Sequence, residues 1–98
     1  MNEKLIVSGI LEIYGKLLTE KQREMAELYY SCDLSLGEIA EIKGVSRQTV
    51  NETVKKVKAE LENFEQKIGF YQIKSQLIKL SGEVDENTSK RLTEIIEN

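Results

Sequence analysis

The chain of 98 residues has no proline, tryptophan or histidine, and it has a single cysteine. Without histidine it lacks the side chain that most often serves as a general base or a metal ligand. Cys32 has no partner for a disulfide within the chain, which favours a reducing compartment. No apolar stretch is long enough to span a membrane, and Glu12 and Lys16 interrupt the apolar N-terminal residues, unlike a signal peptide. We therefore expect a cytoplasmic protein with no metal, no cofactor and no membrane partner.

The sequence also lacks the elements of an enzyme site. It has no glycine-rich phosphate loop, and the Cys32 thiol has no histidine to activate it. Its carboxylates are numerous, but they fall on helix faces that we expect to be solvated. We expect no catalytic residues and no small-molecule substrate.

The residues that are abundant favour helices. Apolar residues make up 40% of the chain, and Leu, Ile, Glu and Lys dominate. No stretch alternates apolar and polar residues for long enough to predict a strand. The sequence therefore predicts an all-α fold, a single domain with at most an extended appendage.

Residues 35–58 have the pattern of a helix-turn-helix. Ser35 followed by Glu38 forms a capping box that begins one helix. Gly44 ends that helix, and Ser46 caps a second one. The apolar residues spaced to pack these helices together are Leu36, Ile39, Ala40, Val45, Val50 and Val54. The alternative is a plain structural corner between two helices.

The second helix of the motif carries the candidate DNA-binding residues, because in such motifs its N-terminal residues reach base edges in the major groove. Arg47 would contact guanine, and Gln48 or Asn51 adenine. Lysines further along would contact phosphates. The full set is Ser46, Arg47, Gln48, Asn51, Lys55, Lys56 and Lys58. The alternative interpretation is an ordinary solvated helix face.

Charge is unevenly distributed along the chain, whose net charge is −3. Residues 43–58 hold five basic residues and one acidic residue, a net charge of +4, whereas residues 20–42 hold two basic and six acidic residues, a net charge of −4. One basic helix on an acidic body suits a selective contact and disfavours a protein that coats nucleic acid without selectivity.

The motif is expected to sit within a bundle of four helices. Apolar periodicity predicts helices over about 5–17 and 20–31, and Thr19 with Gln22 forms a second capping box. The fourth helix is predicted to run from about Arg47 to Ile68. Along it the heptad positions, four and three residues apart in turn, are Val50, Val54, Val57, Leu61, Phe64 and Ile68. This seam either buries against the first helix of its own chain or pairs with a second copy.

The last 30 residues continue the helical pattern. Gly69 either ends the fourth helix or is tolerated within it; an amphipathic segment then reaches Leu80, and Asp85 caps a last helix. We expect a helix-turn-helix domain at 1–68 and a C-terminal helical extension at 69–98. Its apolar residues would be a liability if exposed, so the extension should pack on the body or on a second copy. We expect a homodimer, with a dimer or packing seam at Val57, Leu61, Phe64, Ile68 and Tyr71.

Residues 11–72 resemble the YlxM-like family of small bacterial proteins. The resemblance is carried by Tyr14-Gly15, Leu18-Thr19-Glu20-Lys21-Gln22-Arg23, Leu28-Tyr29-Tyr30, Asp33-Leu34-Ser35-Leu36-Gly37-Glu38-Ile39-Ala40 and Ser46-Arg47-Gln48. It implies the helix-turn-helix of the fourth conserved region of sigma factors, a winged-helix-like class, and a regulatory DNA-binding role. It also implies a link to the signal recognition particle pathway, because genes of this family tend to neighbour those for its GTPases.

The chain departs from the family in the helical turn after Gln48. The family usually has an alanine, an aromatic and an acidic residue there, whereas this chain has Thr49 and Asn51 in place of the first two. This change alters the outward face of the presumed recognition helix, and with it any shared target sequence.

Two functions are compatible with these observations, besides a purely structural dimerisation module. The first is a DNA-binding regulatory protein acting in the signal recognition particle pathway. The second is an adaptor that binds signal recognition particle RNA, or the GTPases of that pathway, without reading a DNA sequence. RNA recognition relies on shape and phosphate contacts, so it would tolerate Thr49 and Asn51.

Overall fold

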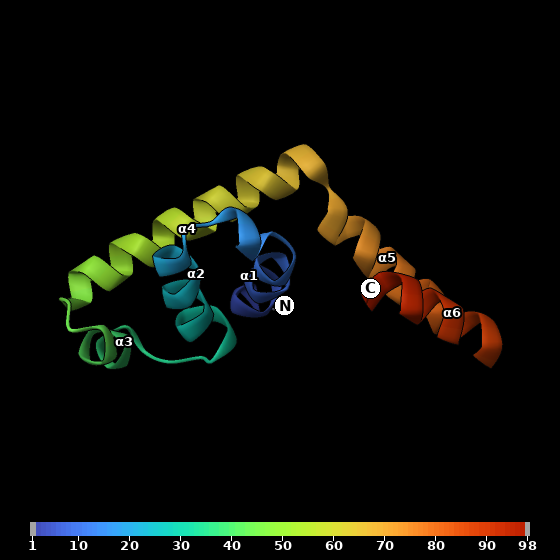
Figure 1. Ribbon diagram of the computed structural model, residues 1–98, viewed down its shortest axis with the longest axis horizontal. Helices are drawn as coiled ribbons and strands as arrows, with labels where there is room; N and C mark the ends of the chain where they lie inside the picture. Colours follow the sequence, from blue (N-terminus) through green and yellow to red (C-terminus); the bar gives the residue numbers. More distant parts are fainter. Residues whose placement is uncertain (1, 98) are drawn as a thin grey trace. The chain divides into compact units, whose positions relative to one another are not determined.

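The computed structural model describes residues 2–97, and all regular structure in that range is helical. In chain order the elements are α1 (Glu3–Tyr14), η1 (Gly15–Leu17), α2 (Glu20–Ala26), η2 (Glu27–Ser31), α3 (Leu36–Lys43), α4 (Arg47–Ile68), α5 (Phe70–Ser81) and α6 (Glu86–Glu97) (Figure 1). The predicted all-α class is therefore confirmed. Since residues 2–97 contain no strand, the helix-turn-helix stands without the wing that a winged-helix-like fold would add. None of these helices combines the length and apolar character needed to cross a membrane.

The chain divides into two compact units between Ile68 and Gly69. Gly69 adopts φ 72° and ψ 17°, the left-handed conformation that glycine enters without steric cost. Of the two alternatives for this glycine, the structure has the first, because α4 ends at Ile68.

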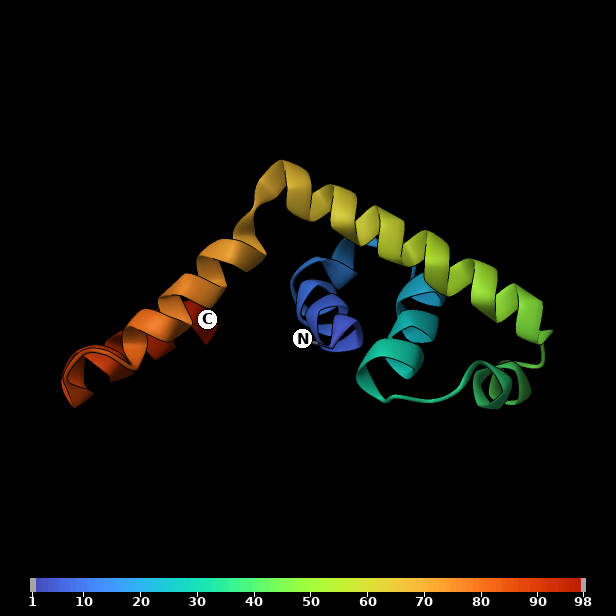
Figure 2. The same ribbon diagram turned by 180° about the vertical axis from the view of Figure 1, so that it is seen from behind.

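Helix α4 organises the first unit, and it lies along one side of α1, α2 and α3 in both views (Figures 1 and 2). Its buried residues meet those of the shorter helices in a single apolar core. That core comprises Val7, Ile10, Leu11, Tyr14, Leu18, Met25, Ala26, Tyr30, Ile39, Val50, Val54, Val57 and Leu61. Burial of this surface gives most of the free energy that holds the motif in place.

The heptad seam packs largely within its own chain. Its first four positions, from Val50 to Leu61, are at most 2% exposed. Phe64 is half-buried, with its ring centroid 6.0 Å from that of Tyr14, and Ile68 is 55% exposed. Val57 and Leu61 are therefore packing residues of the first unit, because fully covered side chains have no surface to offer a second copy.

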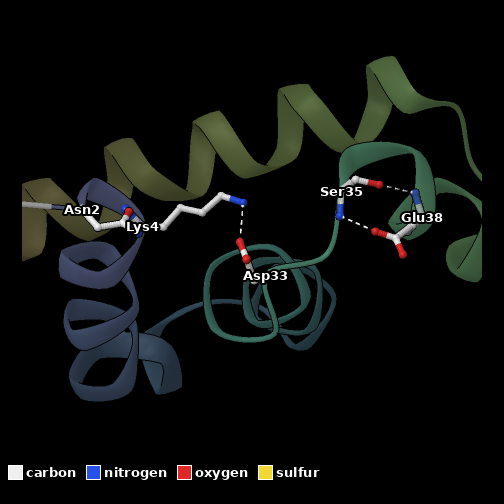
Figure 3. Close-up of polar contacts among 5 residues, drawn as sticks. All are labelled: Asn2, Lys4, Asp33, Ser35 and Glu38. Carbon is white, nitrogen blue, oxygen red and sulfur yellow. Dashed lines mark hydrogen bonds and ion pairs between the residues drawn. The ribbon is translucent and has the colours of Figure 1, made fainter.

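The connection from α3 to α4 has the predicted caps. The Ser35 amide donates to Glu38 Oε1 at 2.9 Å, and the Glu38 amide donates to Ser35 Oγ at 3.1 Å (Figure 3). The backbone hydrogen bond from Ser35 holds the pKa of the Glu38 carboxyl below its usual value. After α3, Gly44 adopts φ 67°, and the amides of Gly44 and Val45 both donate to the Ala40 carbonyl.

Two predicted helices differ in detail from those observed. The first was expected over 5–17, but it begins at Glu3, where the Asn2 side chain caps the Lys4 amide at 2.9 Å, and its last turn is the 3-10 helix η1. The second was expected to be regular over 20–31, but its last turn is the π-helix η2, closed by a bond of 2.9 Å from the Cys32 amide to the Glu27 carbonyl.

The second unit is a hairpin of α5 and α6. The Thr88 amide donates to Asp85 Oδ2 at 3.2 Å, so Asp85 is the predicted cap of α6, and its hydrogen bonds with Thr88 lower the pKa of its carboxyl. No residue between Gly69 and Glu97 is buried. Large apolar side chains instead stay open, with Ile73 50%, Ile78 53% and Ile95 70% exposed.

Candidate nucleic-acid interface

The first turn of α4 projects its polar side chains into solvent. Arg47, Gln48 and Thr49 are all exposed. Ser46, which precedes them, has a structural role, because its hydroxyl accepts a hydrogen bond from the Thr49 amide at 3.0 Å and pairs with the Thr49 hydroxyl at 2.8 Å. Ser46 therefore caps the helix, whereas Arg47 remains accessible to a ligand.

An acidic residue interrupts the outward face of this helix. Gln48 Nε2 donates to Glu52 Oε1 at 3.2 Å, one turn further along α4. This bond orients the Gln48 amide but leaves the Glu52 charge exposed. The Glu52 carboxylate would repel a phosphate that approaches this face of the helix. The face therefore favours an uncharged contact such as a base edge.

A basic flank, formed by Arg47, Asn51, Lys55 and Lys58, runs along α4 beside the face that carries Gln48 and Glu52. Asn51, Lys55 and Lys58 follow Arg47 by four, eight and eleven residues, which places all four on one side of the helix. Lys56 is roughly 140° around the helix from Asn51, so it does not belong to this flank. Six of the seven candidate residues therefore lie on the first turn or on one flank, and Lys56 does not.

The basic flank borders a hollow shared with the start of α1 and with η2. Its lining residues are Glu3, Lys4, Tyr29, Tyr30, Asn51, Val54, Lys55 and Lys58. The hollow thus brings together three of the sequence-predicted residues and adds Glu3 and Lys4, which the sequence pattern did not indicate. Glu3 and Lys58 are 55 residues apart, and no local pattern announces that they meet.

Ion pairs link the two sides of this hollow. Lys58 Nζ is paired with Glu3 Oε1. Lys4 Nζ lies 3.0 Å from Asp33 Oδ1, in the turn that precedes α3 (Figure 3), and 4.0 Å from the centroid of the Tyr29 ring. Asp33 adopts φ 57°, a left-handed conformation that its short polar side chain tolerates. The Lys58–Glu3 pair thus joins the start of α1 to the flank of α4, and the contacts of Lys4 join it to η2 and to the turn that precedes α3.

Tyr30 fixes the floor of the hollow. Its hydroxyl donates to the Val54 carbonyl of α4 at 3.2 Å, and its ring meets Tyr29 edge-on at 4.9 Å between centroids. Burial raises the pKa of the Tyr30 phenol to about 12, so it remains a neutral donor at physiological pH.

Two observations elsewhere in the described chain concern metal binding and a second hollow. Within residues 2–97 no group of three or more His, Cys, Asp or Glu residues is placed to hold a metal ion. A second hollow between α1 and α2 is lined by groups of mixed charge, among them Glu12, Lys16 and Arg23. Cys32 is exposed at its edge.

Comparison with known proteins gives one consistent result. The family described as "Putative helix-turn-helix protein, YlxM / p13 like", UPF0122, matches residues 1–98. A UPF0122 protein of Fusobacterium nucleatum is 40% identical over 99 residues, which cover 100% of this chain and 96% of the relative. A UPF0122 protein of Clostridium perfringens is 36% identical over 99% of this chain and 96% of its own length. One from Thermoanaerobacter sp. is 49% identical over 65 residues, 66% of this chain and 56% of the relative.

Proposed function

The chain belongs to the UPF0122 family of YlxM/p13-like helix-turn-helix proteins, and on that premise we propose that it is a DNA-binding regulatory protein acting in the signal recognition particle pathway. The observation that carries the DNA-binding part is the exposed first turn of α4, capped by Ser46, with Arg47 and Gln48 open to solvent. A duplex would meet this turn in its major groove, where Arg47 is suited to guanine.

The distribution of charge supports selective binding. The chain as a whole has a net charge of −3, so duplex DNA is repelled from most of its surface. The basic flank is the part of this surface that attracts DNA. The exposed carboxylate of Glu52 disfavours positions of the duplex that would bring a phosphate to this side chain. This combination is suited to a regulator that binds few sites.

A second candidate function follows from the hollow beside α4. Lys4, Lys55 and Lys58 converge there, and lysines in such a hollow suit phosphates of any sequence. The alternative is therefore an adaptor that docks on signal recognition particle RNA or on an acidic surface of the GTPases of that pathway. In that case the sequence-reading role of Arg47 would be dispensable.

The C-terminal hairpin leads us to propose that the protein acts as a homodimer. Two such hairpins form a four-helix bundle, which would cover the exposed Ile73, Ile78 and Ile95. Charge is complementary for this arrangement, because α5 carries two lysines and no acidic residue, whereas α6 has three acidic and two basic residues.

The proposed function is tested by fluorescence-anisotropy titration at two salt concentrations. The probes are pooled genomic duplex fragments and signal recognition particle RNA, and the variants are Arg47→Ala and, as a matched loss of one charge at the far end of α4, Lys67→Ala. Duplex binding that survives competitor DNA and is lost only in Arg47→Ala would establish the DNA regulator. Binding to RNA alone would support the adaptor. Absence of binding to both probes would overturn the DNA regulator and the RNA adaptor, and would leave docking on the GTPases as the remaining alternative.

A further inference from the structure

We propose that the hollow between the start of α1 and the flank of α4 is a binding site for a backbone phosphate of the nucleic acid, formed by Lys4, Lys55 and Lys58, with Glu3 as the charge that the phosphate displaces. This proposal rests on the proposed function, since it assumes that nucleic acid is the ligand. It assigns a role in binding to the first turn of α1, which lies outside the helix-turn-helix motif.

The composition of the hollow supports a phosphate. Three lysines line it and only one carboxylate, that of Glu3, does so. The remaining lining residues are uncharged: Tyr29, Tyr30, Asn51 and Val54. A phosphodiester group carries one negative charge and accepts hydrogen bonds, so it matches both the excess of positive charge and the donors of Asn51 and the lysines.

The present partners of two of these lysines are easily exchanged. Lys58 is paired with Glu3, whose side chain is 68% exposed, and Lys4 is paired with Asp33, whose side chain is 81% exposed. Exposed ion pairs of this kind contribute little to stability. A phosphate can therefore take the place of Glu3 beside Lys58 without disturbing the core beneath.

The position of α1 adds to this attraction. The helix begins at Glu3, so its first turn, where the positive end of the helix dipole lies, borders the hollow. Lys4 is also oriented by an uncharged neighbour that a phosphate would not displace, because its Nζ lies 4.0 Å from the centroid of the Tyr29 ring. The Lys4 charge is thereby fixed at the rim before a ligand arrives, which reduces the entropy lost on binding.

This site changes the role expected for Asn51. The motif pattern predicted that Asn51 contacts an adenine edge, but its side chain is half-buried and lines the hollow. We infer that its amide donates to the same phosphate. Base reading would then be left to the first turn of α4, and the nucleic acid would follow the flank of α4 towards α1, on the side away from Lys56.

The test measures affinity and its salt dependence in the full-length protein, with the same duplex and RNA probes. We expect Lys4→Ala to weaken binding about threefold to tenfold and to reduce the slope of log K against log salt by about 1, as expected for one lost phosphate contact. Glu3→Gln should tighten binding severalfold, because it removes the competing charge. Lys16→Ala, which removes a lysine from the second hollow, should leave both quantities unchanged.

The outcomes separate this site from the proposed function. If Arg47→Ala abolishes binding while Lys4→Ala behaves like Lys16→Ala and Glu3→Gln gives no tightening, the phosphate site is wrong and the DNA-binding role stands. If Lys4→Ala weakens binding and Arg47→Ala has no effect, the site is supported and the sequence-reading role fails. If the unaltered protein binds neither probe, both are wrong.

Two further controls protect this interpretation. Lys4→Arg keeps the charge and should restore affinity, and thermal unfolding of each variant should match that of the unaltered protein. Inorganic phosphate, added at constant ionic strength, distinguishes the two sources of a phosphate group. If it competes with the probes in the unaltered protein and less so in Lys4→Ala, a backbone phosphate occupies the hollow. If it binds the unaltered protein through Lys4 without displacing the probes, the hollow is a site for free phosphate and the backbone assignment is overturned.

Discussion

Tyr30 is the side chain whose ionisation most directly affects this fold. Its pKa rises from 10.0 to about 12 on folding, so the folded state holds the phenolic proton more tightly than the unfolded chain does. The stability contributed by this proton is complete below about pH 10 and is lost as the pH rises towards 12.

We expect Tyr30→Phe to lower the free energy of unfolding at pH 7 by about 1 kcal/mol, the usual net value of one lost hydrogen bond. The difference from the unaltered protein should shrink between pH 10 and pH 11.5, because the tyrosine of the unfolded chain ionises in this range, whereas the folded state must keep the proton that Tyr30 donates to the Val54 carbonyl. Urea unfolding at the two pH values measures this. If the difference in free energy of unfolding between the two proteins were the same at both pH values, folding would not change the pKa of Tyr30.

The same substitution to alanine can be compared at two glycines of the motif, Gly44 in the turn and Gly37 inside α3. Gly44 has φ 67°, and a Cβ added there would meet no atom within 4 Å, so Gly44→Ala tests backbone strain alone. We expect it to destabilise the protein by about 1–2 kcal/mol. Gly37 lies inside α3, and a Cβ there would approach only Ser35 Oγ, at 4.0 Å.

Gly37→Ala should therefore stabilise the protein, by about 0.5–1 kcal/mol, since alanine is the better helix former. Thermal unfolding of both variants checks the opposite signs. If both variants were destabilised equally, the left-handed turn would not be the cause.

The heptad seam of α4 is buried up to Leu61 and exposed at Ile68. Substituting each of these residues by alanine measures how much each part of the seam contributes to stability. Leu61 is fully buried, so Leu61→Ala leaves a cavity and should cost about 2–5 kcal/mol. Ile68, one heptad further on, is 55% exposed, and Ile68→Ala should change the free energy of unfolding by less than about 0.5 kcal/mol. Denaturant titration decides this, and a large loss in Ile68→Ala would show that the seam is covered to its end.

The limits of α4 could be predicted from the sequence because its signals are local. A serine cap at Ser46, a regular heptad pattern and a glycine at position 69 each act within one helical turn. The π-helix η2 could not be predicted, since Tyr29 and Tyr30 fit a regular helix equally well and their contacts with Lys4 of α1 and the Val54 carbonyl of α4 are remote in sequence.

The candidate site was predicted only in part for the same reason. Arg47 and Gln48 were placed correctly on the exposed first turn, because position relative to a cap is a local property. Asn51 was expected to face outwards, but it lines a hollow whose other wall comes from α1. The contact between Glu3 and Lys58 depends on how helices cross, which periodicity within one helix does not encode.

Self-association of the complete chain is tested on α5. Ile73→Glu places a charge among the exposed apolar side chains, and we expect it to abolish the proposed dimer without unfolding the first unit. Ser75→Glu adds the same charge elsewhere on α5 and serves as the control. Sedimentation at about 100 μM distinguishes a particle of twice the chain mass of 11.2 kDa from a monomer. A monomeric unaltered protein would contradict the dimer.

The distribution of buried residues along the chain has a consequence for biosynthesis. Every buried apolar residue described lies between Val7 and Leu61, so the ribosome adds α5 and α6 only after all of these core residues. At about 5–20 residues per second, synthesis of the segment from Phe70 to Glu97 takes roughly 1–6 s. Small helical bundles fold in about a millisecond or less. The first unit can therefore form as soon as it leaves the ribosome, and the nascent chain would carry a folded first unit while the residues of α5 and α6 are still within the ribosome.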